Sequence, residues 1–476
     1  MDENELPHNE TYEWTGQFWF PDKEDEKLSG HLSYTPDSGF TFKLFTDLEP
    51  YTNPTHELSK SRKVMFGKAL RGKSIETLSL FNVSLYPRST SYVDEYATLR
   101  LDGYVDSIML KGHLLPEQIQ RLKIQYDDHY NFFYLSPSRK EEDMVNFAKG
   151  EKLTTNSNWH ISLKAESMSK HIYRPEQLES MFWSREDTEL NQLKEHLALY
   201  LEKNELFKRT STNFVTVFAS PNKSYQDFIS FEHRWRAFFE FMEDQPISVQ
   251  NAWISYNWTD QDGCTRLISK PLLSNRYTPR KQKSSPKHIL HRKMSFYDFQ
   301  KNNYNLSNLK NSFDKWHTLK TENHWQPVHE EIQRLMRPKE HFGETSAYVS
   351  LLASIETLLD LLLEKKKDVD VLINKYASDN WCARLKSKGH FPKGNSLGVD
   401  LKKIRNAITH PMGFKNCIYA TIRSDPFLLQ YYYIFLSALF LKATIEYLDI
   451  GNEALREKYS QSYINNRANI YPIEFS

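Results

Sequence analysis

The sequence predicts an α+β protein: a β-rich N-terminal region, folded as a sandwich or an open barrel, followed by a C-terminal bundle of helices. Short aromatic and β-branched runs, separated by turn residues, follow one another from Tyr12 to about Ile108. After about residue 320, apolar residues recur with the helical period of 3.6. We therefore expect three parts: a β-rich domain over 1–170, a mixed α/β continuation over 171–318, and a helical domain over 319–476.

The first strands have the clearest signals. Tyr12–Phe20 is rich in aromatic residues and ends at Pro21 and Asp22. Leu28–Tyr34 and Phe40–Leu44 flank a Pro-Asp-Ser-Gly turn, which predicts a hairpin. Further strands are expected over Ser74–Tyr86, Glu95–Lys111, Phe132–Tyr134 and Trp159–Lys164.

The spacing of the apolar residues changes in the middle of the chain. Regularly spaced leucines predict one or two helices over Pro175–Phe207. Asn213–Ala219 reads as a buried strand, Tyr225–Met242 as an aromatic helix, and Ser248–Trp258 as another strand. This region therefore mixes both element types.

A basic segment follows at 275–293, and it contains no acidic residue. Its prolines and serines predict a loop. One interpretation is a solvated linker, and the other is an electrostatic contact with RNA or DNA phosphates. The candidate RNA-binding residues are Arg280, Lys281, Lys283, Lys287 and Arg292. A weaker basic cluster comprises Lys60, Arg62, Lys63, Lys68, Arg71 and Lys73.

The C-terminal helices are predicted from their apolar stripes. Phe342–Lys365 is the strongest, with Tyr348, Leu351, Leu352, Ile355, Leu358, Leu359 and Leu362 in helical phase. Glu322–Arg337, Asp368–Ser378, Val399–Thr409 and Pro426–Ile450 are expected as further helices, and Ser387–Gly398 as a polar loop. The last helix is apolar, but Gln430, Ser437 and Lys442 interrupt it, so we expect a buried core helix and no membrane span.

Composition excludes several classes of protein. The net charge is +1, which gives no global attraction to nucleic acid, and only 15 glycines occur. Cys264, Cys382 and Cys417 are far apart and lack metal-ligand spacing. His324, His329 and His341 lie near glutamates without a known metal motif, and no P-loop, GxGxxG, GxSxG or kinase motif occurs. We expect a cytoplasmic protein without disulfide, metal or cofactor.

One stretch carries groups suited to phosphodiester chemistry. Arg405, Asn406 and His410 lie within six residues, and Pro411 predicts that their helix ends at His410. Glu356 shares a helical face with leucines, so it needs a partner, and Arg405 is the expected one. The alternatives are a helix end with solvated Arg and His side chains, and a Glu356 that reaches water at the edge of its stripe.

These residues resemble a known family. Arg405-Asn406-Ala407-Ile408-Thr409-His410 matches the RNxxxH form of the RxxxxH signature of HEPN domains. The aromatic N-terminal runs Trp14–Trp19 and Leu28–Leu32 are similar to the N-terminal domain of ApeA-type anti-phage proteins, which join such a region to a C-terminal HEPN domain. The C-terminal bundle is therefore expected to be HEPN-like.

The resemblance implies a metal-independent endoribonuclease that acts as the toxic effector of an abortive-infection defence. His410 would move protons, Arg405 would stabilise charge on the phosphate, Asn406 would bind the phosphate or orient His410, and Glu356 would hold Arg405. The expected partners are RNA, with tRNA as one candidate, a second copy of the chain bound through the helical domain, and a phage-derived trigger.

Two other functions stay open. The bundle could be a non-catalytic module that binds RNA or protein, since HEPN-like bundles also serve as interaction domains. The chain could also be a nucleotide-modifying partner of another enzyme, although no nucleotide-binding motif supports this. The Arg, Asn and His set favours the nuclease, because a scaffold needs none of these groups.

Overall fold

The computed structural model contains two compact units, which comprise residues 1–152, 158–228 and 248–281, and residues 153–157, 229–247 and 282–476. The three-part division expected from the sequence stays a prediction. The structure describes residues 6–48, 61–93, 96–126, 151–155, 158–172, 207–221, 223–243, 247–260, 262–277, 306–321, 326–335, 345–363, 368–377, 379–388, 394–409 and 426–451.

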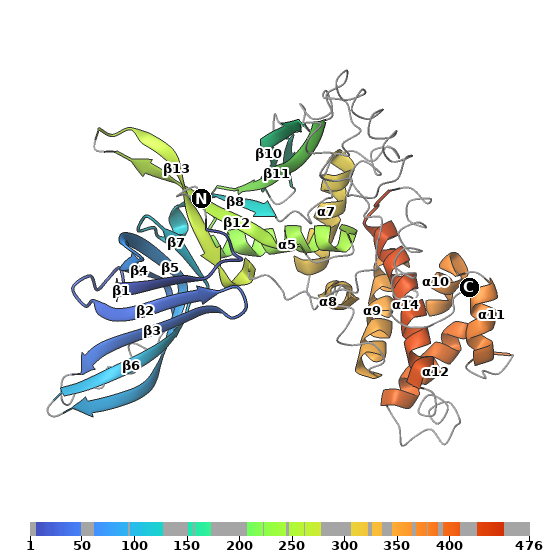
Figure 1. The fold of residues 1–476 in the computed structure, drawn as a ribbon. Helices are drawn as coiled ribbons and strands as arrows, with labels where there is room; N and C mark the ends of the chain where they lie inside the picture. The colour runs from blue at the N-terminus through green and yellow to red at the C-terminus, as the bar shows by residue number, and fades with distance from the viewer. Residues whose placement is uncertain are drawn as a thin grey trace, which may run out of the picture. The chain divides into compact units, whose positions relative to one another are not determined.

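The first unit is built on one antiparallel sheet (Figure 1). Among the described residues, the sheet has thirteen strands in the order β4-β1-β2-β3-β6-β5-β7-β13-β12-β8-β11-β10-β9. Their bounds are β1 Tyr12–Trp19, β2 Leu28–Thr35, β3 Gly39–Leu48, β4 Arg62–Arg71, β5 Ser74–Val93, β6 Tyr96–Tyr104, β7 Ser107–Leu110, β8 Ile119–Tyr126, β9 Glu151–Thr154, β10 His160–Ile172, β11 Phe207–Ala219, β12 Val249–Thr259 and β13 Thr265–Ser274.

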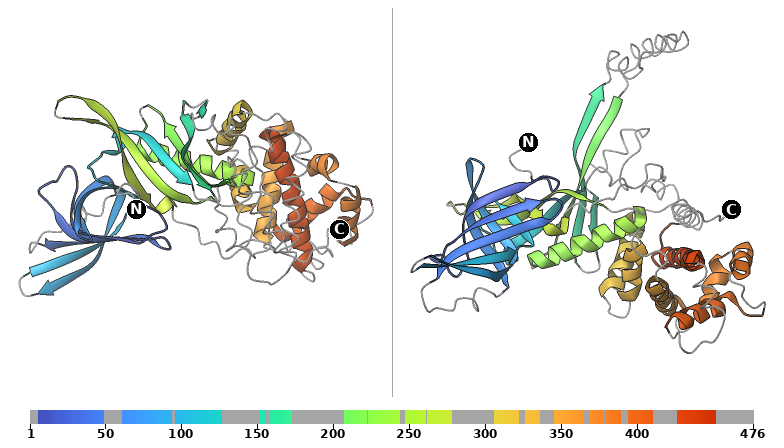
Figure 2. Two further views of the ribbon diagram at one scale, coloured as in Figure 1. Left: turned by 45° about the horizontal axis from the view of Figure 1, so that its top comes forward. Right: turned by 60° about the horizontal axis from the view of Figure 1, so that its bottom comes forward.

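Six of these strands close into a barrel, whose curl is visible in Figure 2. Strand β5 makes the closure, because its first half pairs with β4 and its second half with β6. Asn82 lies between the halves with a φ of 51°, a left-handed conformation that asparagine tolerates better than most residues. The expected sandwich or open barrel is therefore corrected to a closed ring, since one long bent strand supplies both edges.

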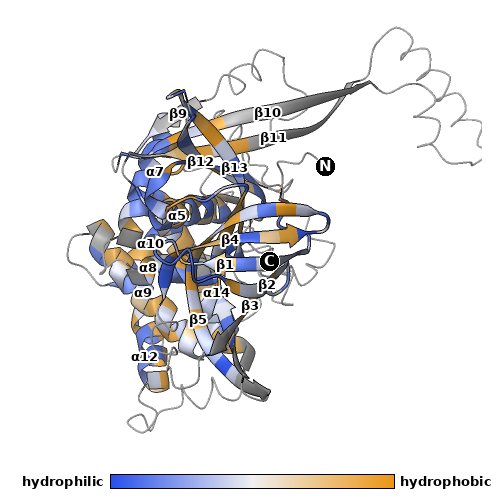
Figure 3. Cartoon of the chain, turned by 90° about the vertical axis from the view of Figure 1, so that its left-hand side faces the viewer, coloured by the Kyte–Doolittle hydropathy of each residue, from blue (hydrophilic) through white to orange (hydrophobic). Residues whose placement is uncertain are grey.

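The barrel interior is filled by alternate side chains of its strands. Trp14, Phe18, Leu32 and Phe42 are almost fully buried there. The alternation along the strands appears as bands of orange and blue in Figure 3. Gly16 faces Gly30 in the β1–β2 register, and a Cβ at Gly16 would lie 2.3 Å from a backbone oxygen of β4, so only glycine allows this approach.

Four strands were absent from the sequence-based expectation: β4, β8, β9 and β13. Strand β4 had been read only as a cluster of basic residues. Met65 and Ala69 point into the barrel core, whereas Val64 and Lys68 lie on the other side of the strand. The expected elements at Phe132–Tyr134 and Pro175–Phe207 lie outside the described residues.

Helix α5 (Tyr225–Glu243) begins in the first unit, where Tyr225 stacks on Phe81 at 4.5 Å and Phe228 contacts Trp159 at 5.0 Å. Beyond residue 228 it belongs to the second unit, where Trp235 and Phe238 pack against Phe313 of α7 (Leu306–Thr321). The aromatic helix expected over Tyr225–Met242 therefore forms, and it carries the chain from one unit to the other.

The second unit is helical. It contains α7, α8 (Gln326–Leu335), α9 (Thr345–Leu363), α10 (Val369–Tyr376), α11 (Asp379–Lys388), α12 (Leu397–Thr409) and α14 (Pro426–Tyr447). Helix α9 is central, since it packs on α8, α12 and α14. Six of its seven expected core residues, from Tyr348 to Leu359, are buried, and Leu362 is half-buried. Helix α11 forms partly within the stretch expected as a loop.

Helix α14 is long and apolar enough to cross a membrane by length and composition alone. However, 83% of that apolar stretch, within Leu428–Tyr447, is buried inside the fold. Most of its side chains from Tyr432 to Ala443 are covered, as in the core helix of a bundle. This arrangement agrees with the buried helix expected from the sequence.

Candidate active site

Helix α12 carries the candidate site, and side chains of α10 fix its start. The Ser396 hydroxyl accepts a hydrogen bond from the Val399 amide at 3.3 Å and donates one to the Asp370 carboxylate. The same carboxylate accepts the Gly398 amide at 2.8 Å. These bonds satisfy amides at the helix start, and the negative charge suits the positive end of the helix dipole.

The buried face of α12 sets the direction of the site residues. Leu397, Leu401, Ile404 and Ala407 are buried, with the spacing of one helical face. Arg405 and Asn406 follow Ile404 directly and are half-buried at the edge of this face. Packing of the apolar residues therefore brings both polar side chains to the boundary between core and solvent.

Glu356 of α9 holds the Arg405 guanidinium. One terminal nitrogen of Arg405 donates to both carboxylate oxygens, at 3.0 and 2.9 Å. The pairing expected from the sequence is therefore present. The side chains remain 26% and 21% exposed for Arg405 and Glu356, so the pair is sheltered without being sealed from solvent.

Asn406 and Lys402 complete the polar cluster. The Asn406 side-chain oxygen lies 3.4 Å from Nε of Arg405, a long hydrogen bond. Lys402 approaches the Glu356 carboxylate at 3.9 Å, so two cations face one anion here. Guanidinium and ammonium groups are the side-chain groups with which proteins bind phosphate.

Tyr348 links α9 to α12. Its buried hydroxyl donates to the Leu401 carbonyl at 3.0 Å. Burial raises the pKa of Tyr348 well above its ordinary value, the neighbouring Tyr432 adds to the rise, and Arg405 opposes it. The phenol therefore stays neutral and keeps its proton for the Leu401 carbonyl, one turn before Arg405.

The remaining predicted site residues are not brought together by the described structure. His410 directly follows α12 but lies outside the described residues, as do Arg280, Lys281, Lys283, Lys287 and Arg292. Arg276, which the sequence grouped with the basic segment, belongs to a short 3-10 helix and pairs with the buried Asp106 at 3.0 Å. Its charge is therefore used within the first unit.

Metal ligation finds no support among the described residues, where no group of three His, Cys, Asp or Glu side chains converges. Cys264 is an exposed free thiol, and Cys417 is outside the described part of the chain. The cluster around Arg405 therefore offers a guanidinium, an ammonium and an amide for binding an anion.

Sequence reasoning missed Lys402, Tyr348 and Asp370 as parts of this site. Lys402 had a usable signal, because it lies three residues before Arg405 and so on the same side of the helix. Tyr348 was recognised only as a core residue, although a buried tyrosine hydroxyl requires an acceptor. Asp370 had no signal, since its contact depends on how α10 and α12 pack.

Comparison with known proteins gives one clear result. The family model described as ApeA N-terminal domain 1 matches residues 13–316. Neither a curated protein nor a solved structure gives a significant match. The matched region includes the sheet apart from Tyr12 and ends within α7, before the helix that carries the candidate site.

Proposed function

Because the chain belongs to the ApeA family, which connects it with anti-phage defence, we propose that it is a metal-independent endoribonuclease and the toxic effector of that defence. Its catalytic residues are Arg405, Asn406 and His410, with Glu356 as the residue that positions Arg405. RNA is the substrate, with tRNA as one candidate. The N-terminal region restrains the nuclease or senses a phage-derived trigger.

One observation carries this proposal: the Arg405 guanidinium is oriented by Glu356 and still 26% exposed. In an ion pair that serves structure alone, further hydrogen bonds must satisfy the remaining donors to offset the desolvation of the charges. Here one nitrogen faces the carboxylate, and the described residues give the other donors only the long contacts to Asn406. The remaining donors can bind the oxygens of a phosphodiester, as arginine does in phosphate sites.

The chemistry follows from RNA itself. The 2′-hydroxyl attacks the adjacent phosphorus, and the 5′-oxygen leaves, which yields a 2′,3′-cyclic phosphate and a 5′-hydroxyl. His410 removes the proton from the 2′-hydroxyl or supplies one to the leaving oxygen. Arg405 stabilises the charge that develops on the non-bridging oxygens, and Asn406 binds the same phosphate or orients His410.

A second copy of the chain completes the site in this proposal. In-line cleavage benefits from both a base and an acid, and one chain offers a single His410. A two-fold symmetric dimer through the helical domain brings two such histidines to one cleft. The dimer is therefore part of the proposed mechanism.

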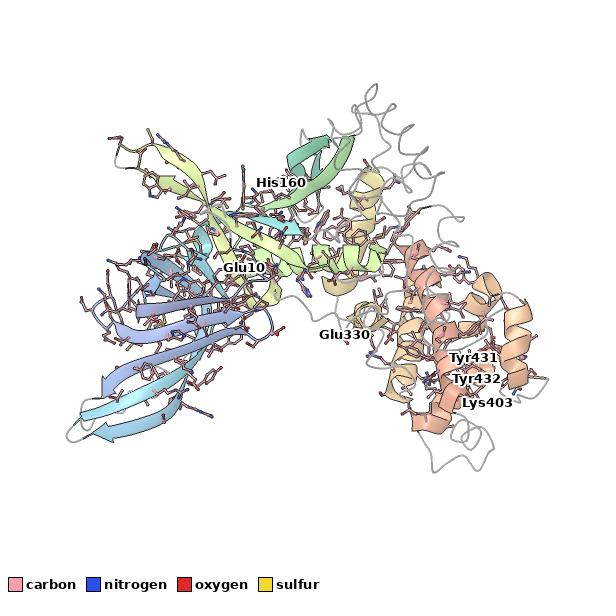
Figure 4. All side chains as sticks on the ribbon, in the orientation of Figure 1. Glu10, His160, Glu330, Lys403, Tyr431 and Tyr432 are labelled. Atoms are coloured by element: carbon pink, nitrogen blue, oxygen red, sulfur yellow. The ribbon has the colours of Figure 1, made fainter. Side chains whose placement is uncertain are left out.

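Cleavage of total RNA in EDTA tests the proposal. Wild-type protein should cut RNA and leave 2′,3′-cyclic phosphate ends, whereas His410→Ala and Arg405→Ala should not cut it. Lys403→Ala is the matched control, because Lys403 is a half-buried cation on the same helix that pairs with Asp400 at 3.8 Å (Figure 4). It should cut like the wild type, and each variant should keep the wild-type oligomeric state.

Two other results would contradict the proposal. Full cleavage by both His410→Ala and Arg405→Ala would refute the assignment of these residues. RNA binding without cleavage, unaffected by His410→Ala, would favour the non-catalytic binding module instead.

The basic segment is proposed as an RNA contact. Charge reversal at Lys281, Lys283 and Arg292 should weaken RNA binding and flatten its dependence on salt, because fewer counterions would be released. Equal binding by this variant and the wild type would remove the segment from the proposal.

A further inference from the structure

The sheet of the first unit has two different faces where β13, β12, β8, β11 and β10 lie side by side. One face is apolar: Leu122, Ile254, Phe218 and Ile161 are each at most 1% exposed. Trp159, which lies on the same side as Ile161, contacts the start of α5 at 5.0 Å. We call the opposite side the outer face and define it by the residues that alternate with these four.

Two rows of side chains cross the outer face. In the first, the strand registers align His160 of β10 with Ala219, Ala219 with Arg121 of β8, and Arg121 with Ser255. His160 and Arg121 are both exposed, and two strand spacings, about 10 Å, separate them. His160 is labelled on β10 in Figure 4.

The second row holds an aromatic side chain beside a cation. Lys123 of β8 is aligned with Trp253 of β12, and its ammonium lies 4.6 Å from the centre of the indole ring. Both are half-buried, so the ring is accessible in part. The contact also keeps the ammonium close to the sheet surface, two residues along β8 from Arg121.

The charge of the outer face has one sign. Within the described parts of the five strands, its outward positions carry Arg121, Lys123 and His160 and no aspartate or glutamate. The other outward positions carry hydroxyl and amide groups, such as the Ser255–Ser269 pair at 2.7 Å, and apolar side chains, among them Leu267, which is 41% exposed. A local basic surface in a chain of net charge +1 is a specific feature of the fold.

We propose that the outer face binds single-stranded RNA, with a base against Trp253 and backbone phosphates at Arg121 and Lys123. Sheets that bind single strands combine these elements: an aromatic ring for stacking, cations along the backbone, and polar groups for base edges. An acidic protein surface would match the charge but would not use an accessible indole beside two cations. The choice of RNA over other single strands rests on the proposed function.

Binding to a short fluorescein-labelled strand of 2′-O-methyl RNA tests this proposal with the full chain, by anisotropy across a range of salt concentrations. The probe lacks the 2′-hydroxyl nucleophile, so its binding is measured whether or not the protein cleaves RNA. Wild-type binding without cleavage of natural RNA would retain this proposal and reject the proposed nuclease. Cleavage of natural RNA without any binding of the probe would reject this proposal and retain the proposed nuclease.

Two pairs of substitutions distinguish RNA binding at the outer face from a general effect of the charge of the protein. Arg121→Gln with Lys123→Gln should lower the slope of log affinity against log salt by about 1.4, for two lost phosphate contacts. Lys27→Gln with Arg88→Gln removes the same charge from exposed positions elsewhere in the first unit, before β2 and in β5, and should leave that slope unchanged. An equal decrease of this slope in both double variants would overturn the proposal.

Stacking is tested at Trp253. Trp253→Ala should weaken binding about tenfold or more, and Trp253→Phe should retain most of the affinity, because a phenyl ring still stacks on a base. Circular dichroism of both variants checks that the sheet is intact. Wild-type affinity in a folded Trp253→Ala protein would refute the assignment.

Discussion

The Glu356–Arg405 pair allows a prediction that separates stability from catalysis. Its two partners lie on different helices, α9 and α12, and one Arg405 nitrogen contacts both carboxylate oxygens at 2.9–3.0 Å. Glu356→Gln keeps the shape of the side chain but removes its charge. The swapped pair Glu356→Arg with Arg405→Glu restores opposite charges but moves the guanidinium to α9.

The expected magnitude follows from the exposure of the pair. An exposed ion pair contributes about 0.2–1 kcal/mol, and a buried hydrogen bond to a charged group about 1.5–3 kcal/mol. With exposures of 26% and 21%, this pair lies between these limits, so we expect a coupling energy of about 1–2 kcal/mol. In Arg405→Ala, the Glu356 carboxylate still has Lys402 at 3.9 Å as a partner. The measured coupling energy is therefore lower than the full contribution of the pair.

Urea denaturation of the wild type, Glu356→Gln, Arg405→Ala and the variant with both of these changes gives the coupling energy as a double-mutant cycle, and the swap is measured beside them. RNA cleavage is measured on the same proteins. We expect the swap to recover much of the stability lost by the single changes, while cleavage stays abolished because the cation has left α12. Cleavage near the wild-type rate in the swap would refute the claim that Arg405 acts on the phosphate.

Three further outcomes follow from the same unit. Gly398→Ala should destabilise the protein by about 1–3 kcal/mol, because a Cβ there would lie 2.6–2.7 Å from the Asp370 carboxylate; Gly394→Ala, with open space around it, is the control in the same urea titration. Tyr348→Phe should cost about 1 kcal/mol through the lost bond to Leu401, and a loss in the denaturation midpoint smaller than the error would contradict this. Because burial raises the pKa of Tyr348, the unfolded chain ionises first, so the free energy of unfolding should fall as pH rises above 10, and Tyr348→Phe should fall less steeply.

Much of the fold could be predicted from local patterns. The N-terminal hairpin and helix α9 follow from alternation and from the helical period, which act over a few residues. Barrel closure could not be predicted, because it depends on the pairing of β1 with β4 and of β3 with β6, which are not neighbours along the chain, and on the left-handed backbone at Asn82. Strand β4 was missed for a related reason, since its charged outer side chains concealed the buried ones.

Two parts of the candidate site could be predicted from the sequence: residues that share one helix, and the partner that a buried charge requires. The pairing of Glu356 with Arg405 was expected because a carboxylate in an apolar stripe needs a partner. The roles of Tyr348 and Asp370 depend on which backbone groups α12 presents to its neighbours, and no spacing in the sequence encodes that. The outer face is similar, because Arg121 and His160 are aligned only through the strand between them.

The passage of α5 between the two units has a consequence for synthesis on the ribosome. Trp235 and Phe238 emerge before α7, whose Phe313 and Trp316 cover them in the finished protein. The barrel strands precede all of these and can pair while translation continues. A nascent chain therefore holds a folded sheet and an uncovered aromatic helix until α7 emerges, and the later helix α12 is still absent. If the chain is the toxic effector that we propose, this order of emergence delays assembly of the nuclease domain until the N-terminal domain already exists.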